Sequence, residues 1–293
     1  MLVGPTASGK SALALEVARR LGDVELVSAD SMQVYRGMDV GTAKVTEGEQ
    51  AEVPHHLLDV ADPGEDFSVA RFQAAAAEAI AGIEARGHRA LVVGGTGLYV
   101  QAVVDGLDLP GEWPDLKADL ERRPGEELYR QLAEADPVAA SRIEPGNTRR
   151  LVRALEVTIG SGRPFSSFGP GLAAYPRSRF RLAGVWLPRH VLAERIAARF
   201  RAQLDAGFLD EVGRLKDRMS RTARQALGYK ELLEHLDGAG TLEEAVEEAV
   251  RRTREFARRQ RAWFRRDPRI TWLGTSRNPV DVLPALLGDW SLP

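Results

Sequence analysis

The sequence contains no cysteine among its 293 residues, and it lacks several features of secreted and membrane proteins. Without cysteine the chain has no disulfides and no thiolate metal ligands, in agreement with a cytoplasmic location. No apolar run approaches the roughly 20 residues of a membrane-spanning helix, so we expect no membrane contact. No basic segment followed by an apolar one precedes residue 4, and we therefore expect no export signal.

The small net charge conceals an uneven distribution. The formal net charge is −2, yet residues 251–269 contain nine arginines and two acidic residues, whereas acidic residues dominate 47–66. A basic block of this kind indicates an anionic partner. Hydrophobic residues make up 44% of the chain, which is enough for a sizeable core. The length predicts one large domain, or one domain with an insertion.

The stretch Gly4-Pro5-Thr6-Ala7-Ser8-Gly9-Lys10-Ser11 fits the phosphate-loop pattern G-x-x-x-x-G-K-[S/T] without a mismatch. In such a loop the backbone N–H groups point inward at the positive end of a helix dipole. Lys10 then reaches the outer phosphates, and Ser11 can ligate a bridging Mg²⁺. The motif predicts a bound phosphate chain, most simply that of ATP, and the alternative is a chance loop of similar composition.

The order of apolar segments predicts an α/β fold. Strand-like runs at 25–29, 90–93, 180–187 and 269–273 alternate with helical patterns that begin at Ser68 and span 189–217 and 242–264. Continuous apolar strands indicate a parallel sheet with helices on both faces, similar to phosphate-loop NTPases. Residues 111–178 are helical in pattern and rich in proline. We expect a core formed by residues 1–110 and 179–293, with 111–178 as an inserted helical subdomain.

Two predicted strand ends carry polar groups, and ligands of parallel sheets bind at such ends. Asp30 follows the strand 25–29 and has three interpretations: it holds a metal through water, acts as a general base, or accepts hydrogen bonds from the amides of Ser31 or Met32 in a turn. Thr96 follows Gly94 and Gly95. Its hydroxyl either faces a ligand or caps the next helix.

Two further groups of residues could bind a ligand, but each also has a simpler structural explanation. His55 and His56 are adjacent, but no other ligand cluster lies near them, so a metal site there is a weak hypothesis. Along 247–266, glutamates precede arginines by four residues, which stabilises an isolated helix. The arginines nevertheless exceed the local acids and alternate with Trp263 and Phe264, so we favour contact with a nucleic-acid backbone. A second basic group occurs in the insertion, at Arg142, Arg149, Arg150 and Arg153.

Taken together, these segments resemble the tRNA dimethylallyltransferase family, also called tRNA isopentenyltransferases. The resemblance extends in family order over nearly the whole chain. Val45 stands where the family commonly has proline, and the first strand is short. The matching segments are 4–11, 28–44 (Ser-Ala-Asp-Ser-Met-Gln-Val-Tyr-Arg-Gly-Met-Asp-Val-Gly-Thr-Ala-Lys), 54–59 (Pro-His-His-Leu-Leu-Asp), 93–99 (Val-Gly-Gly-Thr-Gly-Leu-Tyr), 150–156 (Arg-Leu-Val-Arg-Ala-Leu-Glu), 225–231 (Gln-Ala-Leu-Gly-Tyr-Lys-Glu) and 258–265 (Arg-Arg-Gln-Arg-Ala-Trp-Phe-Arg).

The resemblance implies transfer of a dimethylallyl group from dimethylallyl diphosphate to N6 of the adenine 3′ of the anticodon (position 37), in tRNAs that read codons beginning with U. It implies Asp30 as general base, with Lys10, Ser11 and Mg²⁺ acting on the departing diphosphate. The implied partners of a monomeric chain are the donor and the tRNA anticodon stem-loop. The implied tRNA contacts are Asp30, Ser31, Met32, Gln33, Thr96, Arg149, Arg150, Arg153, Gln225, Arg258 and Arg265.

Three other functions fit parts of the sequence. A small-molecule kinase would bind ATP at the phosphate loop and use Asp30 as base, but it needs no arginine block. An adenylate isopentenyltransferase would act on a free nucleotide and likewise needs no surface of tRNA size. An RNA-binding protein with a nucleotide switch would leave Asp30 without a role.

Overall fold

A computed structural model describes residues 1–169 and 171–290 of the chain. The fold divides into two compact units, each with its own apolar core. The larger unit comprises Met1–Asp105 and Arg177–Pro293, and the smaller unit is the segment between them, Gly106–Pro176. The boundaries expected from the sequence lie at 111 and 178.

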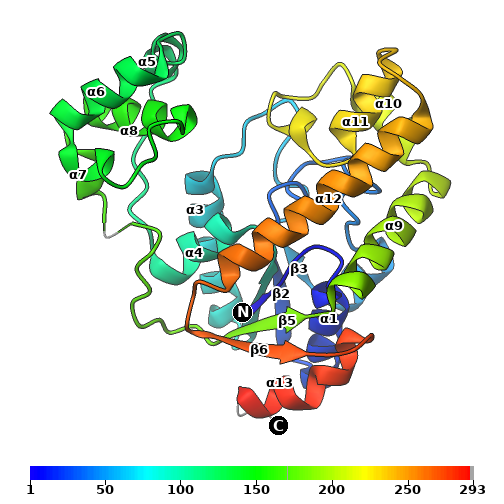
Figure 1. Ribbon diagram of the computed structural model, residues 1–293. Helices are drawn as coiled ribbons and strands as arrows, with labels where there is room; N and C mark the ends of the chain where they lie inside the picture. Colours follow the sequence, from blue (N-terminus) through cyan, green and yellow to red (C-terminus); the bar gives the residue numbers. More distant parts are fainter. Residues whose placement is uncertain (170, 291–293) are drawn as a thin grey trace. The chain divides into compact units, whose positions relative to one another are not determined.

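A six-stranded sheet forms the centre of the larger unit (Figure 1). Its order is β3-β2-β4-β1-β5-β6, and all neighbouring strands are parallel. This topology confirms the predicted α/β class. The short strand β3 was not predicted. The strands are β1 (Leu2–Val3), β2 (Val24–Ala29), β3 (His55–His56), β4 (Arg89–Gly94), β5 (Leu182–Trp186) and β6 (Ile270–Gly274).

Helices cover both faces of the sheet. Successive strand residues point to opposite sides, so each strand contributes apolar side chains to both faces. On one side Val27 and Val92 pack in a cluster with α3 (Val69–Ala85), α4 (Gly97–Asp105) and α12 (Leu242–Phe264). On the other side Leu26 and Leu91 pack with residues of α1 (Lys10–Leu21) and α13 (Leu283–Asp289). Buried apolar residues on both faces explain why the strands appear in the sequence as continuous apolar runs.

The helix predictions for the larger unit are partly correct. The side chain of Ser68 caps α3, as predicted, and α12 has the predicted bounds. The single helix predicted for 189–217 is wrong, because Gly207 has a φ of 91° and separates two helices. The pattern also gave no sign of the short helices at Glu47–Glu52, Tyr229–Leu236 and Leu283–Asp289. The remaining elements are α2 (Glu47–Glu52), α9 (Arg189–Asp205), α10 (Phe208–Leu215), η2 (Ala223–Gln225), α11 (Tyr229–Leu236) and η3 (Pro279–Val282).

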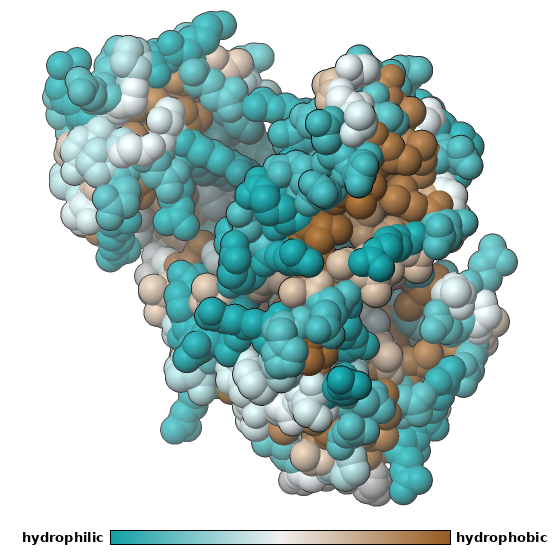
Figure 2. Space-filling model, turned by 45° about the vertical axis from the view of Figure 1, so that its right-hand side comes forward, coloured by the Kyte–Doolittle hydropathy of each residue, from teal (hydrophilic) through white to brown (hydrophobic). Residues whose placement is uncertain are grey.

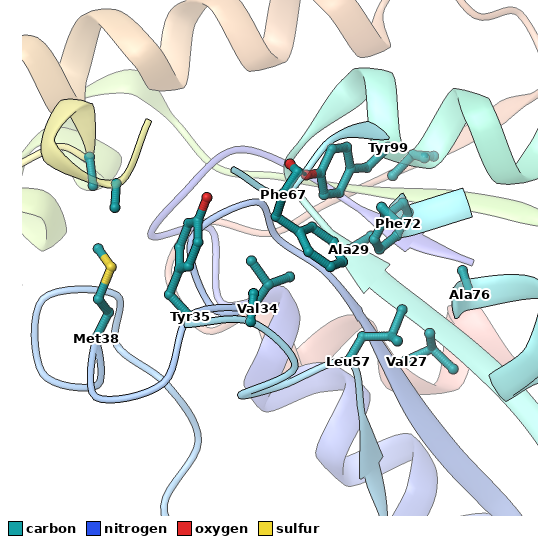
Figure 3. Close-up of a cluster of buried hydrophobic side chains, with 14 of the residues drawn as sticks. Val27, Ala29, Val34, Tyr35, Met38, Leu57, Phe67, Phe72, Ala76 and Tyr99 are labelled. Carbon is teal, nitrogen blue, oxygen red and sulfur yellow. Dashed lines mark hydrogen bonds between the residues drawn. The ribbon is translucent and has the colours of Figure 1, made fainter. Parts of the chain in front are cut away.

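The segment after β2 is ordered although its sequence is polar and rich in glycine. It contains α2, whose first turn has a reciprocal capping box between Thr46 and Glu49. Its first part is held by buried apolar side chains, and an isolated bridge joins Tyr35 to Ala61. Figure 3 shows these side chains in one cluster with residues of α3 and α4: Val34, Tyr35, Met38, Phe67, Phe72 and Tyr99.

The smaller unit is helical and has its own core. Its helix α8 begins after Asn147, whose side chain accepts a hydrogen bond from the N–H of Arg150. Buried leucines of α5, α6 and α8 form the core. The elements are α5 (Pro114–Leu120), α6 (Gly125–Ala135), α7 (Pro137–Ala140), α8 (Thr148–Ser161) and η1 (Phe165–Ser167).

Hydrophilic residues cover most of the face shown in Figure 2, with hydrophobic residues in patches between them. In the described part of the chain, no helix combines the length and the hydrophobicity that crossing a bilayer requires.

Candidate active site

The phosphate loop connects β1 to α1. Its backbone turns at Ala7 and Gly9, which have left-handed φ angles of 61° and 81°. Such turns direct successive N–H groups toward one point, where the N-terminus of α1 adds its positive dipole end. A Cβ atom at Gly9 would lie 2.1 Å from Cγ of Pro279, so this position requires glycine for its φ and for its packing.

A cavity of about 320 Å³ lies over the phosphate loop. Three strand ends were expected to meet the ligand, and all three contribute to the lining: the loop itself, Asp30 with Gln33 at the end of β2, and Gly94 at the end of β4. Gly95 and Thr96, expected at the same end of β4, are not among the lining residues. The structure adds two walls that the sequence analysis missed. These are Thr42 and Ala43 from the segment after β2, and Arg195 and Arg199 from α9.

Positive charge dominates the lining of the cavity. Lys10, Arg195 and Arg199 line it together with a single carboxylate, Asp30. Burial lowers the pKa of Lys10 to about 8, while Asp30 raises it and Arg199 lowers it further. Nη1 of Arg195 is buried and has no hydrogen-bond partner within the described residues. A buried guanidinium of this kind needs an acceptor, so the cavity is suited to a ligand with several negative charges.

Asp30 accepts hydrogen bonds in a turn, which is one of its three expected roles, and it also lines the cavity. Its Oδ1 atom accepts hydrogen bonds from the N–H groups of Met32, at 2.9 Å, and Gln33, at 3.3 Å. Oδ2 accepts no hydrogen bond from the described residues. The turn therefore uses one carboxylate oxygen and leaves the other available to a ligand.

Thr96 stabilises the same turn from the end of β4. Its hydroxyl accepts a hydrogen bond from the N–H of Ser31 at 3.2 Å and lies 3.4 Å from the Ser31 hydroxyl. Thr96 precedes the first residue of α4, but its hydroxyl accepts from Ser31 across the sheet end. The side chain thus links two neighbouring strand ends.

Gln33 is fixed on both sides of its amide. Its Oε1 accepts from the Ser28 hydroxyl at 3.0 Å. Its Nε2 donates to the carbonyls of Thr42, at 3.2 Å, and Ala43, at 3.3 Å. The orientation of Gln33 at the cavity therefore depends on where the backbone of residues 42 and 43 lies.

Gln260 of α12 contacts the phosphate loop directly. Its Oε1 accepts from the N–H of Thr6, and its Nε2 donates to the carbonyl of Gly95, both at 2.8 Å. Arg199 donates to the Thr6 hydroxyl at 2.8 Å. Two sequence features could have pointed to these residues. Arg195 and Arg199 are four positions apart, which places them on one face of a helix, and Gln260 is a neutral residue among arginines.

Three of the residues expected to contact tRNA in the larger unit are exposed, whereas those of the turn after β2 and Thr96 are half-buried. Arg258 lies in the C-terminal part of α12, Arg265 directly follows that helix, and Gln225 ends η2. Arg258 lies 3.7 Å from Glu255, a loose contact, whereas Arg251 pairs closely with Glu248 and Glu255. Charges that lack a close internal partner remain available to an anionic surface.

The arginines of α8 differ from one another. Arg149 and Arg150 are exposed in the first turn of the helix. Arg153 instead donates to the carbonyls of Pro110 and Gly111 and pairs with the buried carboxylate of Glu156. Arg153 therefore has a structural role within the smaller unit.

The two adjacent histidines have protein partners. His56 contacts the carboxylate of Glu25 at 2.6 Å, and His55 contacts the carbonyl of Val53. Arg86, followed by His56 and His88, lowers the pKa of Glu25 to about 2. Across the described residues, no group of three or more His, Cys, Asp or Glu side chains is arranged to hold a metal.

Comparison with known proteins gives a consistent result. The family model described as IPP transferase matches residues 33–267. A tRNA dimethylallyltransferase of Bifidobacterium animalis subsp. lactis is 46% identical, over 96% of this chain and 83% of its own. A tRNA isopentenylpyrophosphate transferase of Bacillus halodurans has a TM-score of 0.72 at 38% identity, covering 99% of this chain and 95% of its own. A eukaryotic dimethylallyltransferase acting on tRNA has a TM-score of 0.81 at 25% identity, covering 100% and 79%.

Proposed function

The chain belongs to the IPP transferase family, the tRNA dimethylallyltransferases, and on that basis we propose how its cavity performs the transfer. The acceptor is N6 of the adenine 3′ of the anticodon, in tRNAs that read codons beginning with U. The bond between N6 and C1 of the dimethylallyl group forms as the bond between C1 and the diphosphate oxygen breaks. The N6 proton passes to the enzyme, and diphosphate leaves.

The phosphate loop holds the diphosphate of the donor, and the three cations of the cavity stabilise it as it departs. The observation that carries this proposal is the set of Lys10, Arg195 and Arg199 around a phosphate loop, with Asp30 as the single carboxylate among the lining residues. Donors aimed at the charge that develops as the C–O bond breaks lower the barrier more than they stabilise the substrate. The loop therefore binds a leaving group.

Asp30 acts as the general base for the adenine amine. Its Oδ1 is occupied by the N–H groups of Met32 and Gln33, which fixes the carboxylate at the end of β2. Its Oδ2 accepts nothing from the described residues, so it is available to the N6 proton. Fixing a base in this way reduces the entropy lost on reaching the transition state.

Mg²⁺ is the expected cofactor, and the residues present are compatible with it. The Ser11 hydroxyl is an oxygen donor that lines the cavity, and Mg²⁺ in proteins usually combines few protein ligands with phosphate oxygens and water. When bound, the ion would neutralise charge on the diphosphate. Ser11 would hold it together with the donor.

The tRNA contacts follow from exposure and position. Gln33 lines the cavity, and Ser31, Met32 and Thr96 lie in or against the same turn after β2. These residues would contact the target adenine after it leaves the stacked loop, which costs about a few kcal/mol. Arg258 and Arg265 on α12, and Arg149 and Arg150 on α8, would contact the phosphate backbone. Gln225 would contact the anticodon loop.

Incubation with labelled dimethylallyl diphosphate and unmodified tRNA tests this function. We expect label in the tRNA and diphosphate in solution. Consumption of ATP without transfer of label would overturn the proposal in favour of a kinase. Transfer of label to free adenine nucleotides but not to tRNA would favour an adenylate isopentenyltransferase.

A further inference from the structure

The wall of the cavity formed by Thr42 and Ala43 belongs to a short loop that is held by local bonds and by contacts with distant helices. Ala43 has a left-handed φ of 51°, a conformation that costs energy for a residue with a Cβ atom. Local backbone bonds join Ala43 to Val40 and Lys44 to Asp39, and the Thr42 hydroxyl donates to the Met38 carbonyl. Nζ of Lys44 donates to the Tyr35 carbonyl and pairs with Asp39 and Asp59. A strained loop keeps one conformation only when its surroundings determine it, and the contacts of residues 39–41 attach this loop to distant helices.

Those contacts come largely from one buried carboxylate. Glu211 of α10 is 2% exposed, and it accepts three consecutive backbone hydrogen bonds. Its Oε2 accepts from Asp39 at 2.9 Å and from Val40 at 2.8 Å, and its Oε1 accepts from Gly41 at 3.0 Å. A carboxylate with three N–H donors holds a loop more strongly than neutral partners would.

Residues of two neighbouring helices complete the attachment. The Tyr229 hydroxyl of α11 donates to Oε1 of Glu211 at 2.5 Å, and Nε2 of Gln203 of α9 donates to the carbonyls of Val40 and Gly41. A Cβ atom at Gly41 would lie 2.1 Å from the ring of Phe208, so the backbone packs directly on these helices. Burial and the charge of Glu211 raise the pKa of Tyr229, which therefore stays protonated and donates.

We propose that Glu211 is a positioning residue for dimethylallyl transfer: by holding residues 39–41 it fixes the Thr42 and Ala43 carbonyls, which in turn orient Gln33 at the cavity. This inference rests on the proposed function, because it assigns Gln33 to the acceptor side of the site. Glu211 reaches Gln33 only through the intervening backbone.

The chain offers a matched control in Glu231 of α11. It is also 2% exposed, it accepts a backbone hydrogen bond from Gly228 at 2.8 Å, and it pairs with Arg252. It is not among the residues that line the cavity. Replacement of either glutamate by glutamine removes a buried charge with backbone partners, but only Glu211 holds the cavity wall.

The experiment compares Glu211→Gln and Glu231→Gln, with thermal unfolding measured alongside steady-state transfer to tRNA. We expect both variants to melt at lower temperature. Glu211→Gln should lower kcat/KM for tRNA by about 10- to 100-fold with little change in donor KM, as small displacements of reacting groups do. Glu231→Gln should leave both constants unchanged. Equal kinetic effects of the two variants at the same folded fraction would overturn the proposal.

A double-mutant cycle with Gln33→Ala tests the route. If Glu211 acts through Gln33, the two substitutions together should cost little more than one alone, whereas additive losses would overturn the proposal. If Glu211→Gln does not fold, Gln203→Ala takes its place, because it removes two hydrogen bonds to the same loop. The expected loss of kcat/KM for tRNA, and the results that would overturn the proposal, are the same as for Glu211→Gln. Failure of the wild-type protein to transfer label would instead refute the proposed function.

Discussion

The main-chain N–H of Thr6 donates to the side-chain oxygen of Gln260 at 2.8 Å, across 254 positions of sequence. This bond joins the phosphate loop to the helix that carries the arginine block. The side-chain Nε2 of Gln260 also donates to the carbonyl of Gly95, which follows β4. One buried side chain therefore connects the loop, the sheet and α12.

Replacement of Gln260 by leucine should weaken binding of the donor. The change leaves the Thr6 N–H and the Gly95 carbonyl without partners in a buried place, and each unsatisfied group costs about 1–3 kcal/mol. We expect a lower free energy of unfolding and a higher KM for dimethylallyl diphosphate. Arg259→Ala, one residue earlier on the exposed side of α12, should change neither. An unaltered donor KM in Gln260→Leu would show that the loop does not need this bond.

Two substitutions at Asp30 separate its role in the turn from its proposed role as the general base. Asp30→Asn keeps an oxygen for the N–H groups of Met32 and Gln33, whereas Asp30→Ala removes the turn as well. A general base contributes about 100- to 10,000-fold, so both variants should lose turnover by at least that factor. Binding of tRNA, measured by filter retention, should be largely intact in Asp30→Asn. Near-normal turnover in Asp30→Asn would leave the carboxylate with a turn-forming role alone.

Donor binding should weaken as the pH rises above about 8. Burial lowers the pKa of Lys10 to about 8 in the free protein, and the diphosphate prefers the protonated amine. At higher pH, binding therefore requires uptake of a proton, and the affinity should fall by up to about tenfold per pH unit. Calorimetry in buffers of different ionisation enthalpy measures that uptake. Lys10→Arg, which stays charged, serves as control. A pH-independent affinity in the wild-type protein would contradict the assignment.

Two arginines of α12 should differ in their contribution to tRNA binding. Arg258 has only a loose contact with Glu255, whereas Arg251 already pairs closely with two glutamates. Arg258→Ala should weaken tRNA binding and reduce the slope of log K against log salt by about 1. Arg251→Ala should alter the slope much less. Identical slopes for Arg258→Ala and the wild-type protein would exclude a phosphate contact there.

Local sequence was sufficient for the parts of the fold that depend on neighbouring residues. The phosphate loop, the cap at Ser68 and the bounds of α12 follow from short spacings, because each involves residues within one or two helical turns. The buried strands were recognisable because apolar residues occupy both faces. The helix predicted across Gly207 failed because one left-handed residue ends a helix without changing the pattern around it.

The sequence by itself determined the family, the α/β class and the phosphate loop, together with Asp30 and Gln33 at a strand end. Only the tertiary structure decided what completes the site. Arg195 and Arg199 reach the cavity from α9, Gln260 reaches the loop from α12, and Glu211 of α10 accepts hydrogen bonds from residues 39–41, next to the lining residues Thr42 and Ala43. The physical reason is distance along the chain: these contacts join residues more than 150 positions apart, and no local pattern records which distant helix face will meet a given loop.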